Sequence, residues 1–492
     1  MIGTAAVSFL AQSGQDSPST MWLVGVLVAA IVLILVLILK FRIQAFVTLL
    51  VAAIFVGLAS GTLSIVDVGG TIVDGMGSAL GFIATIIGLG AIFGQFIEHS
   101  GGAQSLANGL LRVFGEKRAD WAMLMTGFLI SIPVFLDVGV VILAPIIYAL
   151  ARKSGKSLLV FALPLAAGMA VTHAFVPPTP GPTFVAYTLG APLGTAIIWG
   201  VVVGLPTALI CLPFCRKFGT AMFISPPSLA EEKQAQEELH LAQPATLPSV
   251  WVILLILGGP VLLIVLSSVI EAGLASGLQE GLSRDEWKAA LSTAKHEAGL
   301  PVQVMIFFGH PVIALLLGTC AAIVVLGICR GVRGNALMDV ATKALGPAGI
   351  IILITGAGGV FKAMLIETKV GEALATALGE LGIGPLLLAW IFSTIVRVAQ
   401  GSATVAMVTG AALIGPVLEA SGVDYSYAQL SLITIAIAAG STGFSHVNDS
   451  GFWIVSRYFG MTERETLLTW TPVVTIISVV GLVMASLLWF LV

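Results

Sequence analysis

Residues 443–453 read Gly-Phe-Ser-His-Val-Asn-Asp-Ser-Gly-Phe-Trp, and this polar stretch interrupts a segment that is otherwise long and apolar enough to cross a bilayer. His446, Asn448 and Asp449 would each cost several kcal/mol if they faced lipid, so they must be buried in protein or line a wet cavity. The stretch therefore predicts a broken membrane helix that contributes half of a substrate site.

The composition around this stretch is that of a membrane protein. Of the 492 residues, 58% are hydrophobic and only 10% are charged, and the mean hydropathy is +1.07. These values exclude a soluble globular domain. Apolar runs of about twenty residues indicate helices rather than the strands of an outer-membrane barrel. We therefore expect a multi-pass protein of a bacterial inner (cytoplasmic) membrane.

Charge and cysteine content narrow the class further. No Lys or Arg precedes residue 40, so the run 22–39 lacks the basic region of a signal peptide and is expected to be a retained first span. The net charge of -3 predicts no nucleic-acid partner. The four cysteines have no ligand spacing, so we expect neither a disulfide, nor a metal site, nor a cofactor.

The distribution of Lys and Arg assigns the two sides of the membrane. Twelve apolar segments are candidate spans: 22–39, 45–60, 79–97, 121–150, 158–190, 196–215, 250–270, 303–328, 346–364, 384–413, 428–456 and 467–491. Most basic residues fall in the loops 40–44, 98–120, 151–157, 216–249, 329–345 and 457–466, which predicts that these loops are cytoplasmic.

This assignment puts both ends of segment 121–150 on the cytoplasmic side and both ends of segment 384–413 outside. We therefore predict two re-entrant hairpins, with turns at Asp137-Val-Gly139 and at Ala399-Gln-Gly-Ser402. The alternative is a long tilted helix with scattered charges. With the hairpins in place, the sequence predicts an all-α protein with an inverted-topology repeat, in which each half has five transmembrane spans and one hairpin.

The two predicted halves are residues 22–215 and 250–492. The cytoplasmic linker 216–249 is expected to form a short exposed helix between them, and residues 1–21 are an N-terminal extension. Ala166-Ala-Gly168 followed by His173 is echoed by Ala438-Ala-Gly440 followed by His446. These echoes support the repeat and, with the interrupted segments, are typical of a secondary transporter with a site near the bilayer midplane.

Proline breaks the matching segment of the first half, 158–190. The stretch His173-Ala-Phe-Val-Pro-Pro-Thr-Pro-Gly-Pro-Thr183 cannot continue a helix. The N-terminus of the half-helix that follows would favour an anion such as a carboxylate. A proline-rich external loop between two ordinary spans is the alternative.

Arg397 lies inside an apolar hairpin, next to Gln400, Gly401, Ser402 and Thr404. Because a guanidinium is always charged and binds carboxylates bidentately, we interpret it as the clamp for an organic anion. It could also form a structural pair with a nearby carboxylate, and the two roles could coexist. A second pair, Lys362 with Glu367, is predicted near the outer surface and away from the site.

Asp137 and Asp449 are the carboxylates deepest in the two halves, and together with His173 they are the candidates for proton coupling. Sodium coordination by one of the carboxylates remains open. Buried histidines are also often only hydrogen-bond partners. We expect the substrate to be bound by Arg397, Gln400, Gly401, Ser402, Thr404, Pro180, Gly181, Thr183, Ser445, His446, Asn448, Ser450 and Gly451.

Three motifs resemble the gluconate permease family: Phe135-Leu-Asp-Val-Gly139, the stretch 173–182, and above all Ser445-His-Val-Asn-Asp-Ser-Gly-Phe-Trp453. The resemblance implies a proton symporter for gluconate or a related small hydroxy acid. It also places the chain in the ion transporter superfamily and implies a homodimer with an elevator mechanism. The extension 1–21 and the charged segment 271–302 are longer than this resemblance leads us to expect.

Other functions remain as alternatives. One is a sodium-coupled carrier or a carrier of another organic anion, such as a dicarboxylate, although a single Arg favours a monoacid. A passive channel would need rings of charge, which are not evident. An intramembrane enzyme is disfavoured because the sequence lacks His-Glu-x-x-His and similar motifs.

Overall fold

The protein is all-helical in the part that the computed structural model describes, residues 18–229, 232, 246–278, 284–379 and 383–492. In these residues nine helical segments are long and apolar enough to cross a membrane. They are Thr20–Leu39, Ile65–His99, Leu159–Leu189, Leu193–Ala221, Val250–Ala275, Pro311–Arg330, Asn335–Glu367, Ala403–Ala420 and Glu463–Trp489. Parts of the predicted extension 1–21, linker 216–249 and segment 271–302 lie outside the described residues.

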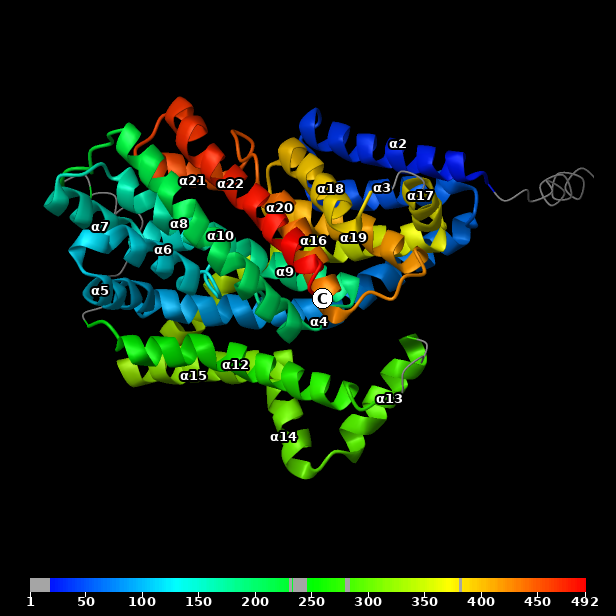
Figure 1. Cartoon of the computed structure of the whole chain (residues 1–492), viewed down its shortest axis with the longest axis horizontal. Coiled ribbons are helices and arrows are strands. Elements are labelled where there is room, and N and C mark those ends of the chain that lie inside the picture. The colour runs from blue at the N-terminus through cyan, green and yellow to red at the C-terminus, as the bar shows by residue number, and fades with distance from the viewer. Residues whose placement is uncertain (1–17, 230–231, 233–245, 279–283, 380–382) are drawn as a thin grey trace, which may run out of the picture.

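Figure 1 shows the helices, coloured from blue to red in the order of the chain. Those of the first half are α2 (Thr20–Leu39), α3 (Ala45–Ser60), α4 (Ile65–His99), α5 (Gly102–Phe114), α6 (Ala119–Ile130), α7 (Leu136–Ser154), α8 (Leu159–Phe175), α9 (Pro180–Leu189) and α10 (Leu193–Ala221). Those of the second half are α12 (Val250–Ala275), α13 (Arg284–Glu297), α14 (Leu300–Gly309), α15 (Pro311–Ala322), α16 (Asn335–Glu367), α17 (Val370–Gly379), α18 (Pro385–Gln400), α19 (Ala403–Ala420), α20 (Tyr427–Thr442), α21 (Ser450–Tyr458) and α22 (Glu463–Trp489).

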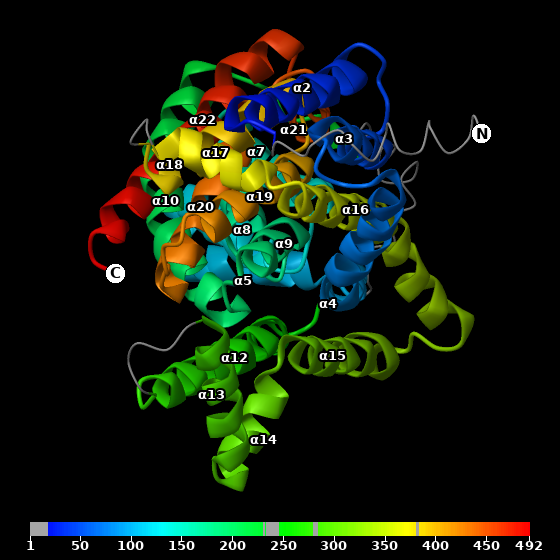
Figure 2. The same ribbon diagram turned by 90° about the vertical axis from the view of Figure 1, so that its right-hand side faces the viewer.

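Helices α8 and α20 form the centre of the molecule, as Figures 1 and 2 both show. Helix α8 packs between α6 and α10, and α20 packs between α18 and α22. In the most apolar stretch of the α8–α9 segment, 94% of the residues are buried. Every residue of α20 from Leu430 to Thr442 is also buried. Polar groups carried within these helices are therefore enclosed by protein rather than by lipid, whereas Asn448, in the stretch after α20, is exposed.

Both predicted broken segments are interrupted close to the expected positions. Helix α8 ends at Phe175 and α9 begins at Pro180, with Val176, Pro177, Pro178 and Thr179 between them. Proline at the first position of α9 costs no hydrogen bond, because a first-turn N–H has no helical partner. Helix α20 ends at Thr442, and α21 begins after the polar stretch at Ser450.

The turn expected at residues 399–402 is also found. Gly401 follows the last residue of α18 with a φ of 90°, a left-handed conformation that glycine adopts without strain. The side chain of Ser402 then caps α19 by accepting a hydrogen bond from the backbone N–H of Val405. Glycine and serine thus end one helix and begin the next.

The other predicted turn, at Asp137-Val-Gly139, is wrong. The turn between α6 and α7 comprises residues 131–135, and Asp137 lies in the first turn of α7. Pro133 stops the helix within this turn, and Ser131 donates to the carbonyl of Val134 over 2.9 Å. Gly139, which suggested a turn in the sequence, is instead required by packing, because a Cβ at this position would meet Met169 of α8.

Some predicted span boundaries also differ. Helices α4 and α16 begin earlier than the predicted 79–97 and 346–364, and they pack along each other through Gly75 and Gly359. Small residues let the two backbones approach closely. The predicted span 303–328 is divided at His310-Pro311 into α14 and α15.

Helices α12 and α15 lie side by side against one flank of the body, and α13 and α14 extend outward from them (Figures 1 and 2). The predicted pair of Lys362 with Glu367 is wrong. Lys362 instead lies 2.9 Å from a carboxylate oxygen of Glu419 and donates to the carbonyl of Thr188, also over 2.9 Å. Lys362 therefore links α16 to the C-terminal ends of α9 and α19.

Candidate functional site

A cavity of about 290 Å³ lies where the helix pairs α6–α7 and α18–α19 meet the two interrupted segments, α8–α9 and α20–α21. Its walls come from α7, α8, α18, α19, α20, α21 and α22 and from α16. The lining residues are Phe135, Leu136, Asp137, Val138, Ala170, His173, Ala174, Pro347, Ile351, Arg397, Ser402, Ala403, Thr404, Thr442, Asp449, Ser450, Gly451, Trp470 and Val474. Eight residues predicted for the site are therefore brought to one cavity: Asp137, His173, Arg397, Ser402, Thr404, Asp449, Ser450 and Gly451.

Three helix N-termini line this cavity. They are the first turn of α7 at residues 136–138, the start of α19 at residues 402–404, and the start of α21 at residues 449–451. Each N-terminus carries backbone N–H groups without helical partners and the positive end of a helix dipole. Their convergence favours a bound anion.

Arg397 adds a full positive charge to this wall from the last turn of α18, where it is 4% exposed. Its Nε donates to the carbonyl of Gly443 over 3.3 Å, and one terminal nitrogen donates to the carbonyl of Gly401. The other terminal nitrogen is hydrogen-bonded to the carboxylate of Asp449. Each terminal nitrogen carries a second N–H, so the guanidinium retains donors beyond these three bonds.

Asp449 is the N-cap residue of α21. Its Oδ1 accepts the backbone N–H of Gly451 over 2.9 Å, and its Oδ2 accepts Arg397 and the hydroxyl of Ser445. The indole N–H of Trp470 donates to the Ser445 oxygen over 3.2 Å, which ties α22 to the same group. The pair of Arg397 and Asp449 is thus satisfied by hydrogen bonds, as a buried ion pair requires.

Asp137 lies on the same wall but in a different state. Its side chain is exposed in the first turn of α7, and within the described part of the chain it has no hydrogen bond or ion pair. His173 of α8 has its Nδ1 buried without a hydrogen-bond partner in those residues, and its ring lies edge-on to Phe135 at 5.9 Å. Both groups are therefore available to bind a proton or a ligand.

Two of the predicted residues in the 443–453 stretch hold the helix break together. Asn448 donates to the carbonyls of Val398 and Ala399 over 3.0 and 3.2 Å, and Nε2 of His446 lies 2.9 Å from the Val398 carbonyl. These carbonyls belong to the last turn of α18, where helical partners are missing. His446 and Asn448 therefore cap α18 from outside the cavity lining. Of the three residues expected to be buried or to line the cavity, Asp449 does both, His446 is half-buried and Asn448 is exposed.

The remaining predicted residues also lie outside the lining. Gly401 packs against the backbone of Asn448, and Gln400 has its Oε1 buried without a partner in the described residues. Gly181 packs against Met407 of α19. Thr183 is buried and donates to the carbonyl of Thr179 over 2.7 Å, and Pro180 begins α9 beside it.

Several lining residues were not predicted. Trp470 and Thr442 have polar groups inside apolar helices, which is a signal that could have been followed. Pro347 and Ile351 come from α16 and carry no such signal, because only the packing of α16 brings them to the cavity. Within the described residues, no group of three or more His, Cys, Asp or Glu is arranged to hold a metal ion.

Comparison with known proteins agrees with this architecture. A solved structure, the YdaH transporter of Alcanivorax borkumensis, is similar with a TM-score of 0.57 and 14% identity. The match covers 86% of this chain and 88% of that one. At this identity the similarity concerns the fold alone, and it is the fold of a membrane transporter.

Sequence relatives are closer. A gluconate permease of Pseudomonas aeruginosa is 37% identical, with 92% of this chain and 95% of that protein covered. A gluconate permease of Bacillus subtilis is 36% identical over 92% and 96% of the two chains. The Gnt-II system L-idonate transporter of Escherichia coli is 33% identical over 93% and 97%.

A family model described as GntP family permease matches residues 21–492. This match confirms the family resemblance carried by the motifs at 135–139, 173–182 and 445–453. Together with the nine candidate spans it confirms a multi-pass inner-membrane protein, and it identifies a permease rather than an enzyme. The chain therefore belongs to the GntP family of permeases.

Proposed function

We propose that this permease imports gluconate, or a closely related small hydroxy acid, together with protons. The observation that carries the proposal is the convergence of three helix N-termini and Arg397 on one cavity. Asp449 balances the charge of Arg397, so the arrangement offers a carboxylate the remaining N–H donors of Arg397 and the positive ends of three helix dipoles. A proton on Asp137 would remove the other negative charge of the lining. The relatives named gluconate permease and L-idonate transporter support a sugar acid as the substrate.

The carboxylate would bind at the starts of α19 and α21, next to the free N–H groups of Arg397. Ser402, Thr404, Ser450 and Thr442 line the same space and carry hydroxyl groups. The Ser402 oxygen already accepts the Val405 N–H and Thr442 donates to the Ala438 carbonyl over 2.8 Å, so Ser402 can still donate and Thr442 can still accept. A polyhydroxylated acid can use these remaining donors and acceptors, whereas an apolar acid cannot. The cavity of about 290 Å³ suits a small molecule rather than a peptide.

Asp137 is the proton carrier in this proposal. Its carboxylate faces the cavity without a partner among the described residues, so protonation breaks no existing bond there. Asp449 is the second candidate, but a proton on it would have to displace the bond from Arg397. His173 is the third, because the free Nδ1 lies close to the same cavity.

We also propose the inverted repeat, with the pairs α6–α7 and α18–α19 as re-entrant hairpins and residues 22–215 and 250–492 as the halves. Two glycines that matched in the sequence support it. A Cβ at Gly168 of α8 would collide with the Leu124 carbonyl of α6, and a Cβ at Gly440 of α20 would collide with the Trp390 carbonyl of α18. Each glycine thus lets a broken segment cross the first helix of its own hairpin.

The homodimer and the elevator motion are further parts of the proposal and depend on the family resemblance. In this mechanism the hairpins and broken segments, which enclose the cavity, would move together as one body. The close contacts of α6 with α8 and of α18 with α20 are consistent with such a unit.

Uptake of labelled gluconate into proteoliposomes tests the function. Accumulation driven by an acid-outside pH gradient and abolished by a protonophore would support proton symport. Accumulation with a sodium gradient alone would overturn the proton assignment and leave the carrier function intact. If gluconate is not accumulated under either gradient while another sugar acid is, the substrate assignment is wrong.

A further inference from the structure

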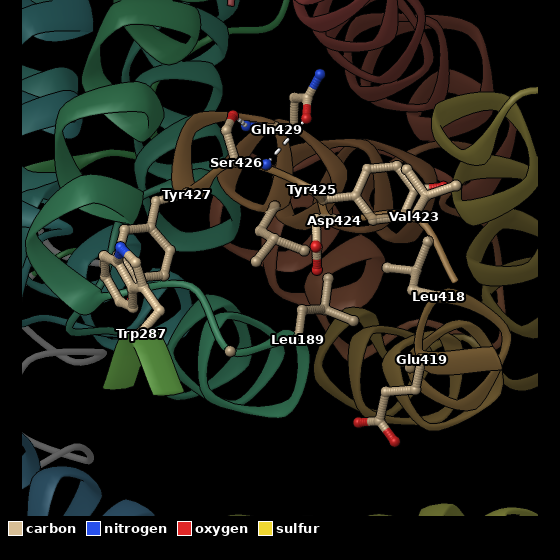
Figure 3. A pocket seen from close by; sticks show the side chains of 13 residues that line it. Leu189, Trp287, Leu418, Glu419, Val423, Asp424, Tyr425, Ser426, Tyr427 and Gln429 are labelled. Atoms are coloured by element: carbon tan, nitrogen blue, oxygen red, sulfur yellow. Dashed lines mark hydrogen bonds between the residues drawn. The ribbon is translucent and has the colours of Figure 1, made fainter. Parts of the chain in front are cut away.

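A second cavity, of about 460 Å³, lies at the C-terminal ends of α9 and α19 and the start of α20 (Figure 3). It shares no lining residue with the Arg397 cavity. One wall comes from α13, in the segment 271–302 that the proposed function does not use. The lining residues are Leu189, Gly190, Trp287, Gly415, Leu418, Glu419, Val423, Asp424, Tyr425, Ser426, Tyr427, Gln429 and Leu430.

Aromatic rings form one corner of this cavity. Trp287 of α13 and Tyr427 of α20 have ring centroids 5.5 Å apart and planes at 76°, so the edge of one ring lies against the face of the other. A third ring, Tyr425, lies on the other side of Asp424 in Figure 3. Ring faces carry partial negative charge and attract cations, most strongly for Trp.

Among the residues that the structure describes, the charged groups of the cavity leave one carboxylate without a counter-charge. Glu419 is paired with Lys362 at 2.9 Å. Asp424 lies between the aromatic groups, and in the described part of the chain it has no hydrogen bond or ion pair. An anion such as a sugar acid would be repelled here, whereas a cation would gain an ion pair with Asp424.

The other polar side chains of the lining are already engaged. Ser426 and Gln429 form the capping box of α20, with bonds of 2.9 and 3.1 Å between each side chain and the other's backbone. The rest of the lining is mainly aliphatic, from Leu189, Leu418 and Val423. The available chemistry is therefore aromatic faces, apolar surface and one carboxylate, which matches an ammonium group carried on an apolar body.

We propose that this cavity is a binding site for small organic ammonium ions, with Trp287 and Tyr427 as the aromatic corner and Asp424 as the counter-ion. The site goes beyond the proposed function, because neither its residues nor its ligand class belongs to gluconate transport. It gives the segment 271–302 a role, since α13 supplies Trp287.

Titration calorimetry on the purified full-length protein tests the site with two probes of matched shape. Choline carries the positive charge, and 3,3-dimethylbutan-1-ol has carbon in place of its nitrogen. Choline is expected to bind at least about tenfold more tightly than the uncharged alcohol, because both the rings and Asp424 act on charge. Equal affinities, or no binding of choline, would overturn the proposal.

Substitutions of the lining residues test whether choline binds in this cavity. Asp424→Asn is expected to weaken choline binding about tenfold and to leave the alcohol unchanged. Asp339→Asn removes an exposed carboxylate near the start of α16, outside the lining, and is the matched control. Trp287→Leu should weaken choline binding while Trp287→Phe retains most of it; an unchanged affinity in both Asp424→Asn and Trp287→Leu would contradict the assignment.

Gluconate uptake by each variant serves as the check on folding, since none of these residues lines the Arg397 cavity. If choline binds as expected and gluconate is not transported by the unmodified protein, the proposed function fails and the ammonium site stands. If gluconate is transported and choline does not bind, only the ammonium site fails.

Discussion

Arg397 in the last turn of α18 is hydrogen-bonded to Asp449, the N-cap residue of α21, across 52 positions of the chain. The two side chains are only 5% and 9% exposed. This ion pair joins the end of a helix in the second helix pair to the break in the following segment. It also holds the guanidinium at the wall of the cavity, so one contact serves both the fold and the proposed anion site.

Breaking this pair from one side should be strongly destabilising. Arg397→Met and Asp449→Asn are each expected to lower the free energy of unfolding by about 3–5 kcal/mol, because the remaining charge would be buried alone. The double variant should lose less than the sum of the two. Thermal unfolding of the purified variants measures this, and additive losses would contradict the coupling. Lys362→Met, which breaks a more exposed pair with Glu419, should cost only about 1 kcal/mol or less.

Arg397→Lys separates the charge from the geometry of the guanidinium. A lysine keeps the positive charge but cannot make the bonds to Gly443, Gly401 and Asp449 at the same time as binding a carboxylate. We expect kcat/KM for gluconate uptake to fall at least about tenfold. A variant with normal apparent affinity would remove Arg397 from the anion site.

Asp137→Asn tests the proton carrier. The substitution keeps the size of the side chain and removes its ability to be charged, so exchange of labelled for unlabelled gluconate should continue. Accumulation driven by a pH gradient should be lost, because no proton would move with the substrate. Asp67→Asn, an exposed residue in the first turn of α4, is the control and should behave like the unmodified protein. Gradient-driven accumulation by Asp137→Asn would transfer the role to Asp449 or His173.

The matched glycines of α8 and α20 should respond alike to substitution. Gly168→Ala and Gly440→Ala both place a methyl group against a backbone carbonyl of the crossing helix, at an expected cost of about 1–3 kcal/mol each. Gly88→Ala in α4 is the control, because nothing lies within 4 Å of the added atom. Melting temperatures of the three variants check this. A large drop in melting temperature for Gly168→Ala, without one for Gly440→Ala, would weaken the argument for the repeat.

Substitution of Gly401 should be poorly tolerated for two reasons. Its φ of 90° is strained for any residue with a Cβ, and that Cβ would collide with the backbone of Asn448. Gly401→Ala is therefore expected to lose at least about 1–3 kcal/mol of stability and to impair transport, since the turn positions Arg397 and Ser402. Gly384→Ala, at the other end of α18, has an ordinary φ of -65° and open space around it, and should be nearly neutral.

Much of the fold was predictable because its causes are local. Long apolar runs specify membrane helices, prolines at 177–182 end α8, and the Gly401-Ser402 pair ends one helix and begins another. The cost of polar groups in lipid identified Arg397 and Asp449 as buried functional candidates. The turn at 131–135 was missed because Gly139 gave an equally local signal that in fact serves packing against Met169.

Contacts between distant segments required the tertiary structure. The amino-acid sequence alone showed that 443–453 must avoid lipid, but it did not show that Asn448 and His446 cap α18 while Asp449 pairs with Arg397. Nor could it place Pro347 and Trp470 at the cavity or Trp287 against Tyr427. Hydropathy and turn chemistry act within a few residues along the chain, whereas these partners are chosen by how whole helices pack.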